Sequence, residues 1–169
     1  MDGSNKGTAV LTAFPLILAA WVYTGSRPQP VGAVPVRRAF SEVTITLDGN
    51  QERPKQTTSN STGAAKFTWT QTSPITYRIE VKALTGVPTA AHIHGPADAE
   101  GTAPPIVTFK LDSVVPNGVI AVGTIDSTMA KIRLDSLKKL MNNGHAYVNV
   151  HTAKYPNGEI RGQFKGGKQ

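Results

Sequence analysis

No cysteine occurs among the 169 residues of this chain. Disulfides, thiolate zinc sites and cysteine nucleophiles are therefore excluded, and any bound metal must be held by nitrogen and oxygen atoms. Acidic residues are also few, 11 against 18 lysines and arginines, which gives a net charge of +7. The basic residues form no run of five and are not interleaved with an aromatic platform. We therefore expect no nucleic-acid partner.

Sequence features of catalysis are missing as well. The chain has no glycine-rich phosphate loop, no nucleophile beside a recognisable base and no isolated acid/base pair of carboxylates. From these residues we expect a non-catalytic protein with no evident small-molecule substrate. The length suits one domain with a segment outside it.

Histidine is scarce, but its placement is informative. The four histidines form two pairs, His92 with His94 and His145 with His151. Residues two or six apart on a strand point to the same face. If the two strands pair or face each other, four neutral imidazoles converge on a site suited to copper or zinc. The alternative is that the histidines only form hydrogen bonds within the domain.

The second histidine pair carries further expectations. A continuous strand over 145–151 places Tyr147 and Asn149 on the face of the two histidines. It turns three small apolar residues toward the core: Ala146, Val148 and Val150.

The rest of the chain after Phe40 predicts an all-β sandwich or barrel, because short alternating segments are separated by turn formers. Strands are expected at 42–47, 63–70, 75–84, 90–95, 103–111, 119–125, 145–151 and 159–165. In the third of these, one face carries Ile75, Tyr77, Ile79, Val81 and Ala83.

One helix is expected, over 135–144, with Asp135 as its N-cap and Gly144 as its stop. Its lysines, Lys138 and Lys139, are interpreted as a solvated face. Near the C-terminus, Asn157-Gly158 predicts a tight turn. Glu159 and Arg161 are then expected to form ion pairs or hydrogen bonds across strands.

The N-terminal segment is the most apolar part of the chain, and residues 7–26 carry no charge. A helix of this length rises about 30 Å, which matches a bilayer's hydrocarbon core. We expect a transmembrane anchor at 1–26, a proline-rich linker at 27–40 and a folded domain at 41–169. The alternative is a signal peptide, with Lys6 as its basic residue and small residues at 31–33 as its cleavage point.

The location of the domain follows less directly. Arginines after the apolar segment indicate a cytoplasmic domain by the positive-inside rule. Short signal anchors, however, commonly send a folded domain outward, and a thiol-free histidine site suits a periplasm. We therefore expect a single-pass inner-membrane protein with its domain in the periplasm.

Two motifs make a specific resemblance. The first is AHIHGPA at 91–97, and the second is GHAYVNVHT at 144–152, which continues through PNGEIRGQ at 156–163. Over about 42–165 the sequence resembles the CHRD domain, a module named after chordin. The resemblance implies a Greek-key β-sandwich related in shape to copper-zinc superoxide dismutase. It implies no general activity, because most members are binding or structural modules.

Two functions follow as expectations. In the first, the chain is a non-catalytic accessory subunit of a larger bacterial membrane complex, anchored in the lipid by its N-terminal helix. A photosynthetic reaction-centre complex is the leading host. In the second, His92, His94, His145 and His151 bind copper or zinc for storage, delivery or superoxide dismutation.

Overall fold

The computed structural model describes residues 40–167. The expected anchor and linker lie outside the described residues, apart from Phe40, which begins the first strand. Within 40–167, no helix has both the length and the apolar character needed to cross a bilayer.

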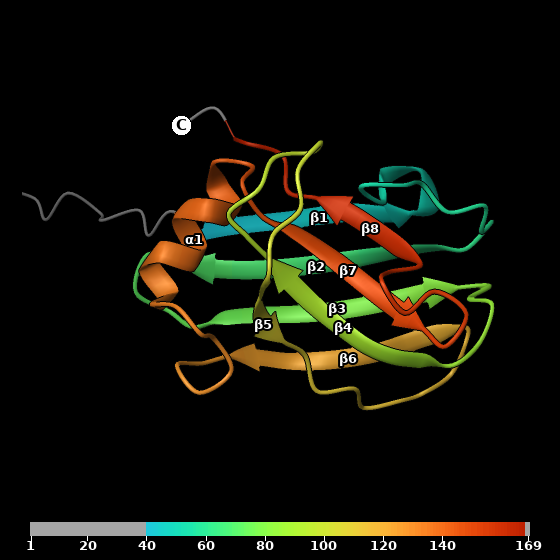
Figure 1. Ribbon diagram of the computed structural model, residues 1–169. Coiled ribbons are helices and arrows are strands. Elements are labelled where there is room, and N and C mark those ends of the chain that lie inside the picture. The colour runs from blue at the N-terminus through green and yellow to red at the C-terminus, as the bar shows by residue number, and fades with distance from the viewer. Residues whose placement is uncertain (1–39, 168–169) are drawn as a thin grey trace, which may run out of the picture. The chain divides into compact units, whose positions relative to one another are not determined.

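The described residues form an antiparallel eight-stranded sheet that is folded into two layers. One layer holds β1 (Phe40–Asp48), β2 (Thr62–Thr70), β3 (Ile75–Lys82) and β6 (Gly118–Ile125). The other holds β4 (Pro88–His94), β5 (Pro105–Thr108), β7 (Tyr147–Thr152) and β8 (Ile160–Gln163). In Figure 1, β4, β7 and β8 cross in front of the first layer at an angle. The expected all-β class is confirmed, and the arrangement fits a β-sandwich.

The two layers join where β1 meets β8, through the pair Asp48 and Arg161. The full strand order is β5-β4-β7-β8-β1-β2-β3-β6. The chain changes layer after β3, after β5 and after β6, so strands far apart in sequence become neighbours. This interleaving brings β4 beside β7, which are the two strands that carry the histidine motifs.

The core lies between the layers and follows from the alternation of the strands. In β3, the expected inward residues Ile75, Tyr77, Ile79 and Val81 are all buried, and the residues between them are exposed. The expectation for Ala83 is wrong, because this residue is exposed and has a φ of 56°. A positive φ turns the backbone out of the strand, so β3 ends one residue earlier.

The other layer supplies the facing half of the core. Its fully buried side chains include Ile93 of β4, Val148 of β7 and Ile160 of β8, and the first layer adds Phe67 of β2 and Ile120 of β6. Burying a side chain of this size contributes about 1.5–3 kcal/mol. The apolar face of each strand in this layer is therefore fixed, and its opposite face is left to polar residues.

The expected helix is present as α1 (Leu134–Asn142). Asp135 is not its N-cap, since Arg133 occupies that position and Asp135 lies in the first turn. Gly144, with a φ of 73°, follows the helix as expected. Such a backbone conformation favours glycine. A separate short 3-10 helix, η1 (Gly49–Gln51), follows β1.

The interpretation of Lys138 as a solvated residue is wrong. Its side chain is only 8% exposed. Its Nζ donates hydrogen bonds to the carbonyl oxygens of Thr70, Gln71 and Ser73 at 3.1, 3.1 and 2.7 Å. These carbonyls belong to the β2–β3 turn, so the ammonium group connects α1 to that turn.

Candidate functional site

The polar face of the layer β5-β4-β7-β8 collects the residues of the candidate site. Because Ile93 and Val148 point into the core, their neighbours along β4 and β7 point outward. Two rows of outward residues run across the strands in register: His92, Asn149 and Arg161 in one, and His94, Tyr147 and Gln163 in the other. His151 pairs with Ala90, beside the first row.

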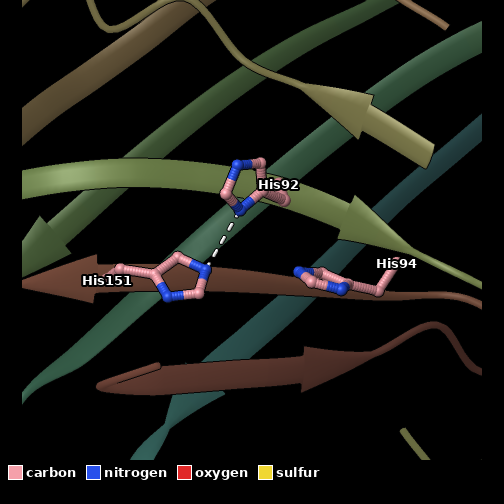
Figure 2. A group of neighbouring side chains, drawn as sticks. All are labelled: His92, His94 and His151. Carbon is pink, nitrogen blue, oxygen red and sulfur yellow. Dashed lines mark hydrogen bonds between the residues drawn. The ribbon is translucent and has the colours of Figure 1, made fainter. Parts of the chain in front are cut away.

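Three of the four histidines come together on this face. Ring centroids lie 5.5 Å apart for His92 and His94, and 5.0 Å apart for His92 and His151. The centroids of His94 and His151 are 6.3 Å apart. One ring nitrogen from each residue lies within 4.8 Å of the others. Figure 2 shows the outer edge of the His94 ring turned toward His92 and His151. These distances bring three potential nitrogen ligands within reach of one ion.

His145 does not join this group. It is exposed and lies before β7, which begins only at Tyr147. Its backbone N–H donates to Leu140 at 2.8 Å, and its carbonyl accepts from Ala97 at 3.0 Å. These bonds hold His145 in the connection from α1, so the continuous strand expected over 145–151 starts two residues late. As expected, Tyr147 and Asn149 lie on the face of the histidines. The three small apolar residues Ala146, Val148 and Val150 are buried in the core, also as expected.

Backbone carbonyls orient two of the imidazoles. His94 Nδ1 lies 2.8 Å from the carbonyl oxygen of Ala103, and His151 Nδ1 lies 3.0 Å from that of Pro156. A carbonyl only accepts, so both Nδ1 atoms donate, and in the neutral ring each Nε2 keeps a lone pair. His94 Nε2 is buried and has no hydrogen-bond partner among residues 40–167.

His92 is held differently. Its Nδ1 lies 3.0 Å from His151 Nε2 and donates to it, because the lone pair of that atom accepts. The dashed line in Figure 2 marks this bond. His92 therefore contacts the group through another imidazole, whereas its two neighbours are anchored to the backbone.

The three imidazoles are neutral at neutral pH. The pKa of His92 is lowered to about 4, mainly by burial and in addition by the neighbouring His151, His94 and Lys131. Burial also lowers the pKa values of His94 and His151 below 6.5. Removing a cation from water is costly, so the uncharged form is favoured. Neutral imidazole is the form that binds metal ions.

A stack of three side chains supports His94. Its ring lies parallel to that of Tyr147, with centroids 4.8 Å apart and an angle of 5° between planes. The guanidinium of Arg161 lies 3.6 Å from the centre of the same tyrosine ring. Since β7 runs between β4 and β8, Tyr147 lies between the other two. Arg161 is only 1% exposed and donates to the carbonyls of Asp98 and Gly101, both at 2.9 Å.

As expected, Glu159 and Arg161 form hydrogen bonds to other parts of the fold, but neither takes part in an ion pair within the described residues. Burial alone raises the pKa of Glu159, but hydrogen bonds that include those from Ser61 and Thr152 outweigh burial and lower it. The sequence showed both charged residues but not their partners, which come from β7 and from loops distant in the chain.

Glu52 and Asn149 complete the polar face. Asn149 Nδ2 donates to both carboxylate oxygens of Glu52, at 2.9 and 3.0 Å. Both residues are 3% exposed. The only sequence signal for Glu52 was its place in the QERP segment after the first strand. Nothing in that segment indicates that it folds over β7.

The fold and the site together define a class: an antiparallel β-sandwich domain with three neutral histidines on the outer face of one layer. Comparison with family models adds the specific result. The CHRD domain matches residues 43–164, and the chain therefore belongs to the CHRD-domain family. No curated protein matches. No solved structure matches either, so the expected likeness to copper-zinc superoxide dismutase stays a prediction.

Proposed function

We propose that this domain binds a transition-metal ion, Cu(II) or Zn(II), through His92, His94 and His151. The observation that carries the proposal is His94 Nε2, which belongs to a group of three imidazoles and whose buried lone pair has no partner in the part of the chain that the structure describes. A buried polar atom left unpaired costs about 1–3 kcal/mol. A metal ion at this position satisfies the atom and uses two further nitrogens.

The donor set fits these ions. Copper and zinc both accept imidazole nitrogen, and neither needs the thiolates that the chain lacks. Three protein ligands leave a coordination position open, as in catalytic rather than structural zinc sites. When bound, the ion supplies Lewis acidity, and copper adds one-electron redox chemistry.

Residues around the group have supporting roles. The carbonyls of Ala103 and Pro156 fix the tautomers of His94 and His151, so that Nε2 carries the lone pair in each. Such outer partners typically contribute 10–100-fold to metal affinity. Tyr147 holds the ring plane of His94. His92 must exchange its bond to His151 for a bond to the ion, since a metal on His151 Nε2 uses the lone pair that accepts from His92.

Metal binding is tested on the full chain by dialysis against Cu(II) or Zn(II), followed by elemental analysis and calorimetry. We expect one ion per chain. His94→Ala and His151→Ala should each weaken binding at least about 100-fold, because each removes a nitrogen lone pair. His145→Ala is the matched control, since this exposed histidine lies outside the group. A chain that takes up no metal, or an equal loss in His145→Ala, would contradict the proposal.

A second proposal concerns the segment outside the described residues. The uncharged stretch at 7–26 favours a membrane-anchored accessory subunit of a larger membrane complex, with the CHRD domain outside the bilayer. This role is compatible with metal binding. Deletion of residues 1–30 should release the domain from membranes. If the truncated chain still co-purifies with a membrane complex in mild detergent, the domain makes the attachment and the anchor does not.

A further inference from the structure

We propose that the metal centre takes a small monovalent anion in its open coordination position, and that Lys131 attracts this anion. The inference rests on the proposed function and names the ligand class of the same site. It is carried by the charges that surround the three histidines.

The protein ligands provide no negative charge. The group within 4.8 Å consists of three histidines, and no carboxylate of the described residues belongs to it. Three neutral imidazoles leave a divalent ion with its full charge of +2. An anion in the remaining position reduces this charge, whereas a fourth neutral ligand does not.

Lys131 lies on the same side of the layer as the histidines. Ala130 pairs with Val107, which pairs in turn with Ile93, and the last two of these are fully buried. The backbone N–H of Lys131 donates to the carbonyl of Ile106 at 2.8 Å, which continues this pairing by one residue. Lys131 follows as an exposed residue at a bend, so its side chain lies in solvent beside β5, on the outer side of the layer that carries His92 and His94.

The electrostatic effects agree with this placement. Besides burial, the ammonium of Lys131 lowers the pKa of both His92 and His94. Arg161 also lowers the pKa of His94, from the β8 side. The two charged side chains named here are both cations, one on each side of the group. Their combined field favours a negative ligand.

Exposure separates the roles of the two cations. Arg161 is 1% exposed and engaged with loop carbonyls, so it acts through its field alone. Lys131 is exposed, and His92 and His151 are partly exposed. An anion can therefore approach the site past Lys131. A single exposed ammonium suits a compact anion such as a halide, azide or a small carboxylate, whereas a phosphate group usually needs several donors.

The test uses the copper-loaded full chain and azide as the probe anion. Azide bound to Cu(II) is followed by its charge-transfer absorption and by the change in the electron paramagnetic resonance spectrum. We expect Lys131→Gln to weaken azide binding about two- to fivefold at low salt, the range for one exposed charge. Lys131→Arg should bind as the wild type does. Lys82→Gln is the matched control, because Lys82 is an exposed lysine of β3, in the other layer.

Salt provides an independent readout. The difference between the wild type and Lys131→Gln should shrink at about 1 M salt, where charges are screened beyond about 3 Å. Copper affinity should not fall in Lys131→Gln, because this substitution removes a positive charge that repels the copper ion.

The outcomes separate the two proposals. A chain that binds no copper overturns the proposed function and this inference with it. Copper binding without an azide signal, or with equal azide affinity in Lys131→Gln and the wild type, overturns the inference alone. A loss of copper in Lys131→Gln also overturns it, because Lys131 then acts on metal retention.

Discussion

Glu52 provides the sharpest test of the buried polar face. Glu52 is 3% exposed, and both of its carboxylate oxygens accept from one amide, that of Asn149. Burial raises the pKa of Glu52 from its ordinary 4.5 to about 7. The hydrogen bond from Asn149 and the charge of Arg161 oppose this rise but do not offset it.

The sign of the effect on stability follows from proton linkage. Between pH 4.5 and about 7 the folded state keeps the proton of Glu52, while the unfolded state releases it. Stability from this group is therefore complete below pH 4.5 and is lost as the pH rises to about 7. Because each pKa unit corresponds to about 1.4 kcal/mol, the loss is about 3 kcal/mol.

Glu52→Gln reproduces the protonated side chain and removes this loss. At pH 8 the variant should be more stable than the wild type by about 3 kcal/mol, and at pH 4 the two should agree within about 1 kcal/mol. The assay is urea unfolding of the metal-free full chain at both pH values. Glu100→Gln is the control, because Glu100 is a carboxylate of the same face that is 79% exposed. If Glu52→Gln is no more stable than the wild type at pH 8, the reasoning is refuted, because ionisation of the buried carboxylate then costs no stability.

Two other predictions concern stability. The pKa of His92 is about 4 in the folded state, so the unfolded state binds a proton at a higher pH than the folded state does. The unfolding free energy of the metal-free protein should therefore fall by up to about 3 kcal/mol as the pH falls from 6.5 to 4. His92→Gln should flatten this slope in unfolding measurements, and an unchanged slope would assign it to other groups. Lys138→Met should destabilise the domain by about 2–4 kcal/mol, because three part-buried carbonyls lose their donor. Lys139 is exposed, so Lys139→Met should change the unfolding free energy by less than about 0.5 kcal/mol. Equal effects in the two variants would show that the hydrogen bonds of Lys138 contribute little to stability.

Much of the fold could be predicted from the sequence, because strand alternation is a local property. The inward residues of β3 and of β7 follow from period-two patterning, and so does the shared face of His92 and His94. The turn at Gly144 follows from the backbone freedom of glycine. The two histidine motifs also indicated the family, since they are contiguous in the chain.

The composition of the site depended on contacts that no local pattern contains. The pairing of β4 with β7 brings His151 to His92, while bonds to Leu140 and Ala97 keep His145 before the strand. Spacing alone treated these two histidines as equivalent.

Sequence by itself thus determined the all-β class, the absence of thiol chemistry and the face on which each histidine of a strand lies. Tertiary structure decided which histidines meet, that Arg161 stacks on Tyr147 and that Lys138 is buried. The physical reason is that alternation fixes the direction of a side chain relative to its own strand. Register between distant strands, and the loops that cover them, fix what that side chain touches.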